Sequence, residues 1–183
     1  MRPAGKELIH YLEELNITLP RGFHTEINLQ ALQWLKEIAD SLASGFVITI
    51  DYGYTSSDLY CDRRRNGTLI CYHKHRVNDH PYDNIGDQDI TAHINFSALS
   101  HWGVKYGMNT HGLISQAAFF AALGFQDYLG QLLSDTKDQY TAFKRFAFIK
   151  RTLLLDIGQK FKVLIQSKGV PAARLKCFQA KNT

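Results

Sequence analysis

Apolar residues recur at helical spacing near the start of the chain and predict two amphipathic helices. The first covers residues 6–16, and a second begins after Asn28 and ends before Gly45. Asn28 is a good helix cap, and glycine is common where helices stop. The apolar stripe of the first helix is Leu8, Ile9, Leu12 and Leu15.

A short apolar run follows the second helix. Residues 46–51 read Phe-Val-Ile-Thr-Ile-Asp, a nearly continuous β-branched sequence that is typical of a central strand covered on both faces. The residues after it, up to Tyr54, lie at the carboxyl end of this strand, where open α/β sheets bind ligands. The order of helix, buried strand and polar break therefore predicts an α/β fold.

After a long loop, the rest of the chain is predicted to contain further helices and strands. The loop covers residues 52–95 and contains a predicted strand at 68–73; loops this long usually have a function. Since only about three main strands are visible, strand 46–51 is expected to lack one neighbour, a hint of truncation. Helices are predicted over 96–106, 115–123 and within 136–156, and strands over 109–114, 160–166 and 174–178.

Composition and charge narrow the class of protein. The 183 residues, 45% hydrophobic with a net charge of +4, suit one globular domain over residues 1–183. No apolar run approaches the roughly 20 residues that cross a bilayer, and no apolar signal core begins the chain. Three scattered cysteines indicate free thiols. We therefore expect a cytoplasmic protein with no membrane or nucleic-acid partner, and Arg63–Arg65 is more typical of a solvated loop than of a phosphate clamp.

Histidines and acids cluster between residues 73 and 93. His73 and His75 would share a strand face and could bind one metal ion, although no classical zinc spacing is present. Residues 89–93 alternate, so Asp89, Thr91 and His93 would also share a face if extended, where a histidine beside a carboxylate suits a general base. The alternative to both hypotheses is a hydrogen-bonded polar loop, which the residues alone favour.

Several segments, in order, carry a resemblance to a known family. The chain resembles the MidA-type S-adenosyl-L-methionine (SAM)-dependent methyltransferases, the family of the mitochondrial complex I assembly arginine methyltransferase. The segments that carry it are Val47–Tyr54, Gly67–Leu69, His73–His75, Asp89–Phe96, Ser115–Phe119 and the closing strand Phe161–Ile165.

The resemblance implies the C-terminal portion of a class I, Rossmann-like methyltransferase fold with an inserted loop. Residues 46–51, 109–114 and 160–166 would be its strands five, six and seven, the last of them antiparallel. Strands one to four, with the glycine-rich SAM loop, would precede Met1. The isolated chain is therefore expected to be inactive and to bind SAM poorly. Its expected partners are a protein substrate and the N-terminal half of the same enzyme, in cis or in trans.

The resemblance also implies a site and a reaction. The reaction would be methylation of a protein side chain such as arginine, with no metal. The alternatives are a non-catalytic assembly or protein-binding module and, behind it, a metal-dependent hydrolase. The residues implied for proton acceptance are His75, Asp89 and His93, and those implied for shaping the substrate pocket are Asp51, Tyr52, Gly53, Tyr54 and Thr91.

Overall fold

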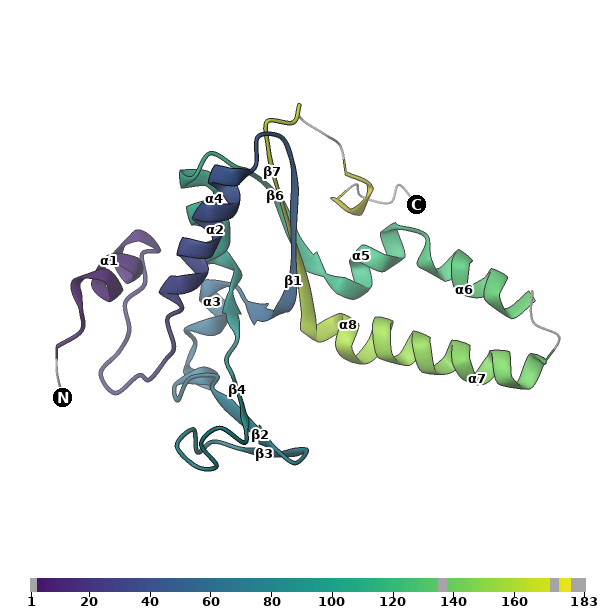
Figure 1. Cartoon of the computed structure of the whole chain (residues 1–183), viewed down its shortest axis with the longest axis horizontal. Coiled ribbons are helices and arrows are strands. Elements are labelled where there is room, and N and C mark those ends of the chain that lie inside the picture. Colours follow the sequence, from purple (N-terminus) through teal and green to yellow (C-terminus); the bar gives the residue numbers. More distant parts are fainter. Residues whose placement is uncertain (1–2, 135–137, 172–174, 179–183) are drawn as a thin grey trace. The chain divides into compact units, whose positions relative to one another are not determined.

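The computed structural model describes residues 3–134, 138–171 and 175–178 (Figure 1). Its tertiary contacts divide the chain into two compact units. Unit 1 comprises residues 1–37 and 53–102, and unit 2 comprises residues 38–52 and 103–183. The organisation as one domain stays a prediction.

Unit 2 is built on three long strands: β1 (Gly45–Tyr54), β6 (Asn109–Ser115) and β7 (Phe161–Lys168). Strand β7 lies between the other two and runs antiparallel to both. Its middle residues Val163, Leu164 and Ile165 are almost fully buried, as expected for a central strand. The structure thus confirms the three predicted strands and the antiparallel direction of the last.

Strand β1 is covered on one face only, so the prediction of cover on both faces is wrong. Phe46, Ile48 and Ile50 alternate along the strand and are 42%, 51% and 42% exposed. Alternate residues of a strand point to the same face, so these three form an apolar surface. Among the described residues, the edge of β1 away from β7 is paired only at its end, where Gly53 and Tyr54 run parallel to β5 (Ile94–Asn95).

The helical part of unit 2 lies between β6 and β7. It consists of α5 (Gln116–Ala122), α6 (Phe125–Ser134), α7 (Gln139–Lys150), the π-helical turn η2 (Arg151–Asp156) and α8 (Ile157–Lys160). Helix α6 lies along α7, and α5 lies along η2 and α8 (Figure 1). Helix α6 was not predicted. The predicted helix within 136–156 is confirmed from residue 139, and its first two positions lie outside the described residues.

The end of the chain departs from the prediction. Residues 176–178 form the short 3-10 helix η3 (Lys176–Phe178), so the strand predicted over 174–178 is wrong at its described residues. Arg174 lies outside the described residues.

Unit 1 packs helices against a loop-rich segment. It contains α1 (Lys6–Glu14), most of α2 (Leu29–Ser41) and α4 (Phe96–Lys105), and the short helices α3 (Ser56–Leu59) and η1 (Asp62–Arg64). A small sheet has the order β3 (Arg76–Asn78), β2 (Ile70–His73), β4 (Asp89–Thr91). Among the described residues, none of the helices combines the length and the apolar character needed to cross a bilayer. The buried core of unit 1 includes Tyr11, Leu35, Phe96, Leu99 and Trp102.

Candidate functional site

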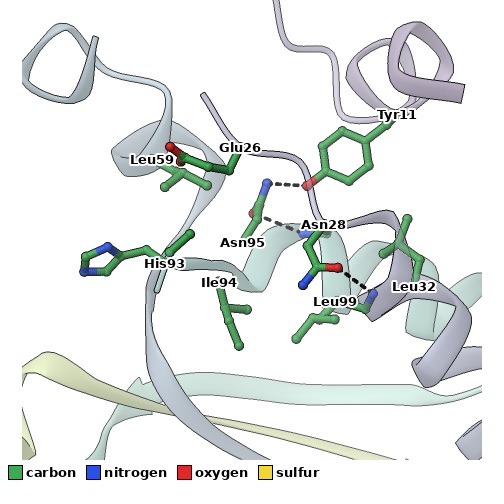
Figure 2. A pocket seen from close by; sticks show the side chains of 12 residues that line it. Tyr11, Glu26, Asn28, Leu32, Leu59, His93, Ile94, Asn95 and Leu99 are labelled. Carbon is green, nitrogen blue, oxygen red and sulfur yellow. Dashed lines mark hydrogen bonds between the residues drawn. The ribbon is translucent and has the colours of Figure 1, made fainter. Parts of the chain in front are cut away.

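The side chain of Asn95 forms hydrogen bonds to several elements of unit 1 (Figure 2). Its Oδ1 accepts a hydrogen bond from the backbone N–H of Ala98 at 3.2 Å and so caps α4. Its Nδ2 donates to Tyr11 Oη at 3.0 Å, and its side chain also contacts Ser56 Oγ at 3.1 Å. One side chain therefore connects α1, α3 and α4.

An enclosed cavity of about 70 Å³ lies beside Asn95. Its apolar walls include Leu32, Ile94 and Leu99, and Asn28 and His93 also line it (Figure 2). The volume suits about two water molecules or one small polar group, whereas ligand pockets usually measure ~300–1,000 Å³. This cavity is therefore too small for a nucleoside.

Burial keeps the Tyr11 hydroxyl neutral. Desolvation raises the pKa of Tyr11 far above its ordinary value, and the neighbouring Tyr60 adds to the effect. Tyr11 therefore acts here as a hydrogen-bonding group and not as a base.

Glu26 fixes the start of the loop strand β2. Its carboxylate accepts hydrogen bonds from the backbone N–H of Thr68 at 3.0 Å and of Leu69 at 3.2 Å. The Thr68 hydroxyl donates to the same carboxylate at 3.1 Å and accepts from the backbone N–H of His93 at 3.0 Å. Gly67 makes this approach possible, because a Cβ there would lie 2.2 Å from Glu26 Oε1.

An aromatic and cationic stack adjoins this region. The rings of Tyr54 and His93 lie 5.0 Å apart, tilted by 31°. The guanidinium carbon of Arg64 lies 3.6 Å from the Tyr54 ring centroid, and Arg64 Nη1 donates to the carbonyl oxygen of Asp58. Gly53 allows β1 and β5 to approach each other closely, since a Cβ at this position would lie 2.2 Å from the Ile94 carbonyl oxygen.

His75 and Asp89 line a different, open hollow of about 550 Å³. Both residues are exposed. Lys74 and His75 form the two-residue turn between β2 and β3, with φ values of 47° and 63°. The prediction that His73 and His75 share a strand face is therefore wrong, because the strand ends at His73. His73 Nε2 instead lies 3.1 Å from Asp87 Oδ2.

In the described ranges, no group of three or more histidine, cysteine, aspartate or glutamate side chains is placed to hold a metal ion. A metal-dependent hydrolase has no ligand set in this part of the chain.

The structure separates the residues predicted to accept a proton. His93 lines the enclosed cavity, whereas His75 and Asp89 line the open hollow. The extended segment β4 ends at Thr91, before His93, and the Thr91 hydroxyl donates to the Ile70 carbonyl oxygen at 3.1 Å. Thr91 thus stabilises the pairing of β2 and β4 in the small sheet.

The residues predicted to shape the substrate pocket fall in both units. Gly53 and Tyr54 belong to unit 1, and Asp51 and Tyr52 belong to unit 2. Asp51 Oδ1 accepts from the backbone N–H of Tyr52 at 2.7 Å. The Tyr52 ring packs edge-on against Phe161, with centroids 5.6 Å apart.

Sequence reasoning missed Asn95, Tyr11, Glu26 and Arg64 as members of this region. Asn95 had a usable signal, because a short amide directly before an apolar helix is a typical cap. Arg64 belongs to the run interpreted as solvated, and its contact with Tyr54 depends on the fold of η1.

Comparisons with known proteins point to one family. A family model described as "Putative S-adenosyl-L-methionine-dependent methyltransferase" matches residues 1–114. The mitochondrial protein arginine methyltransferase NDUFAF7 homologue of Drosophila melanogaster is 26% identical over 133 residues, which cover 72% of this chain and 28% of that protein.

Two solved structures from Burkholderia thailandensis are similar over nearly the whole chain. One, described as a "likely methyl transferase" bound to S-adenosyl-homocysteine, is 34% identical, with a TM-score of 0.80 over 97% of this chain and 45% of that one. The other, a native crystal structure of an uncharacterised protein, is 33% identical, with a TM-score of 0.81 over 97% and 46%. The chain thus spans about half the length of these structures and 28% of the fly protein.

Proposed function

Since this chain belongs to the "Putative S-adenosyl-L-methionine-dependent methyltransferase" family, we propose that it forms the part of such an enzyme that faces the methyl acceptor. The observation that carries the proposal is the likeness, over 97% of the chain, to a structure bound to S-adenosyl-homocysteine. The α/β architecture, with β7 antiparallel between β1 and β6, agrees with this fold.

The cofactor does not fit the enclosed cavity of unit 1. About 70 Å³ is several-fold less than an adenosyl group needs. SAM supplies the methyl group when it is bound, and we propose that it is held together with a segment equivalent to the part of the solved relatives that this chain does not span.

The residues of this chain have proposed roles on the acceptor side. A nitrogen nucleophile must lose a proton, and His75 and Asp89 are exposed groups that can accept one. His93 and Tyr54 form a half-buried aromatic wall, which suits the flat face of a guanidinium. Arg64 occupies one face of the Tyr54 ring in this way.

We propose a protein side chain, such as arginine, as the acceptor. The fly relative is named a protein arginine methyltransferase, which supports this acceptor at low identity.

Complementation tests the proposal. The chain would be mixed with a polypeptide that corresponds to the unmatched part of the S-adenosyl-homocysteine-bound relative. We expect calorimetry to detect S-adenosyl-homocysteine binding by the mixture and weak or no binding by either part alone. With isotope-labelled SAM, mass spectrometry should find the label on arginine of an added protein. A mixture that associates but neither binds the product nor transfers label would refute the enzyme.

A matched set of variants assigns the roles. His75→Ala and Asp89→Ala should each lower transfer by about 10²–10⁴-fold if the residue accepts the proton, with product binding unchanged. The control is His80→Ala, which removes another exposed histidine of the same loop. Equal loss in the control would assign the effect to the loop as a whole.

The exposed apolar face of β1 favours a second candidate function, a non-catalytic assembly module. Phe46, Ile48 and Ile50 are the kind of surface that a protein partner covers. An assembly module would bind its partner with the same affinity in the presence and absence of SAM, whereas the enzyme needs the cofactor for its activity.

The cellular location stays a prediction. The sequence predicts the cytoplasm, and the fly relative is named as mitochondrial.

A further inference from the structure

Three irregular segments of unit 1 are joined through the side chain of Glu26. Glu26 lies before α2, Thr68 lies before β2, and His93 lies between β4 and β5. The first two segments also meet through their backbones, since the N–H of His24 donates to the carbonyl oxygen of Arg65 at 2.8 Å. Backbone outside helices and strands has no regular ladder of hydrogen bonds, so side chains contribute strongly to fixing its position.

The hydroxyl of Thr68 links Glu26 to His93. Thr68 is only 8% exposed, and its oxygen lies 3.1 Å from Glu26 Oε2 and 3.0 Å from the backbone nitrogen of His93. A hydroxyl has a single proton to donate, and a carboxylate only accepts. The proton therefore points to Glu26, and the oxygen accepts from the His93 N–H. We call this chain of hydrogen bonds, from His93 through Thr68 to Glu26, the Glu26 clamp.

The carboxylate of Glu26 is an anchor for the turn at Thr68 and Leu69. Its Oε1 accepts from the backbone N–H of both residues at 3.2 Å. Its Oε2 accepts from the N–H of Thr68 at 3.0 Å as well as from the hydroxyl. Both oxygens are thus engaged in charge-assisted hydrogen bonds that hold backbone in place. An effect of Glu26 on the acceptor site therefore passes through Thr68 and His93.

The backbone position of His93 sets the spacing of the aromatic wall. The His93 ring lies 5.0 Å from the ring of Tyr54. Tyr54 is held by other contacts, because β1 pairs it with Asn95 and the guanidinium carbon of Arg64 lies 3.6 Å from its ring centroid. Release of the clamp would therefore move the His93 ring relative to Tyr54.

We propose that Glu26 and Thr68 are positioning residues that hold His93 at its place beside Tyr54 on the acceptor side. The inference rests on the proposed function, in which His93 and Tyr54 form a wall for the methyl acceptor. Neither positioning residue needs to touch the acceptor. Since small displacements of such a wall weaken productive binding, loss of the clamp should affect the acceptor and leave the affinity for the cofactor product unchanged.

NMR spectroscopy of the full chain tests the clamp. The ring of Tyr54 shifts the resonances of the His93 ring protons, and Tyr54→Leu measures the size of this shift. Thr68→Val keeps the shape of the side chain but removes the hydroxyl. We expect it to lose most of the shift and to speed exchange of the His93 amide proton about fivefold. Thr68→Ser keeps a hydroxyl and should preserve both quantities.

Two further variants define the path of the effect. Glu26→Gln places an amide NH₂ group against the backbone donors of the turn, so it should change both quantities in the same direction as Thr68→Val. The matched control is Thr91→Val, which removes a hydroxyl two residues from His93 that donates to the Ile70 carbonyl oxygen. It should leave the His93 ring shift unchanged.

Methyl transfer in the complementation mixture tests the role on the acceptor side. With an arginine–glycine repeat peptide as the acceptor, Thr68→Val should raise the KM for the peptide at least about tenfold. The affinity for S-adenosyl-homocysteine should stay within about twofold, and Thr68→Ser should restore the KM. A variant that is only less stable would instead lower kcat through its smaller folded fraction and leave this KM unchanged.

Three outcomes would overturn the inference: an unchanged His93 ring shift in a folded Thr68→Val variant, an equal change in Thr91→Val, or an unchanged KM. Circular dichroism of each variant confirms the fold. The unmodified chain provides a readout that needs no variant, since its His93 amide proton should exchange slowly and show a nuclear Overhauser contact to the Thr68 side chain. If the unmodified mixture transfers no methyl group, the proposed function fails and the acceptor role fails with it, whereas the NMR result still decides whether the clamp holds His93.

Discussion

Asn95 shows how much of unit 1 rests on one amide. It caps α4 through Ala98 and bonds the buried Tyr11 hydroxyl. We expect Asn95→Ala to lower the free energy of unfolding by about 2 kcal/mol, about 1 kcal/mol for the cap and about 1 kcal/mol for the lost hydrogen bond to Tyr11, whose hydroxyl keeps its bond to Tyr60. Urea unfolding followed by circular dichroism measures the change.

Two variants separate the contributions of Asn95. Asn95→Ser keeps a capping oxygen and should lose less than the alanine variant. Tyr11→Phe removes the hydroxyl and should cost about 1 kcal/mol. If Asn95→Ala unfolds within about 0.5 kcal/mol of the unmodified chain, the amide does not hold unit 1 together.

Gly67 and Gly86 form a matched pair that tests the contact with Glu26. Their φ values are 84° and 83°, so alanine is strained equally at both. A Cβ at Gly67 would lie 2.2 Å from Glu26 Oε1, whereas nothing lies within 4 Å at Gly86. We expect Gly86→Ala to cost about 1 kcal/mol and Gly67→Ala at least about 1 kcal/mol more. Equal losses in thermal unfolding would mean that the Glu26 carboxylate moves aside freely.

At the scale of single residues, the sequence predicted which kinds of side chain gather in the loop better than it predicted where each one lies. His75 and Asp89 do line one hollow, but His75 lies in a turn that the β2 pattern did not reveal. The separation of His93 from that pair depends on where β4 ends. Alternation in five residues cannot specify this end, because side chains share a face only as far as the backbone stays extended.

At the scale of elements, a second glycine pair tests the close approach of Gly103 to Gln166 of β7, both in unit 2. A Cβ at Gly103 would lie 1.9 Å from Gln166 Nε2, and Gln166 is fully buried. Gly103→Ala should therefore cost about 2–3 kcal/mol, as overpacking does. Gly130→Ala, in α6 with nothing within 4 Å, should instead gain up to about 1 kcal/mol through helix propensity. A gain at both positions would show that Gln166 yields without cost.

Most of the longer helices and strands could be predicted from the sequence. Periodic apolar runs and capping residues predicted α1, α2, α4, α5, β1, β6 and β7, because each has a strong local signal. The short elements of the loop, such as α3 and β5, form through contacts with other segments, so local pattern did not reveal them. A nearly continuous apolar run likewise suggested a strand buried on both faces, and tertiary packing covers only one face of β1.

At the scale of the whole molecule, two features suggest that another segment completes this fold. The cavity of unit 1 is too small for the S-adenosyl-homocysteine that one solved relative binds, and β1 presents an uncovered apolar face in unit 2. Both features agree with the fact that the chain spans about half of the solved relatives. The ordered motifs of the sequence predicted the family, but motifs do not reveal which faces of the fold stay uncovered.

The β1 face should bind the companion segment proposed above. We expect the triple variant Phe46→Thr/Ile48→Thr/Ile50→Thr to change the free energy of unfolding by less than about 1 kcal/mol, since all three side chains are at least 42% exposed and threonine suits strands. The same variant should lose S-adenosyl-homocysteine binding in the complementation mixture. The contrast is Ile165→Thr, directly opposite Ile48 on β7 but only 3% exposed, which should cost about 2–3 kcal/mol. If the triple variant still supports product binding, the companion segment docks elsewhere and the open face of β1 has another partner.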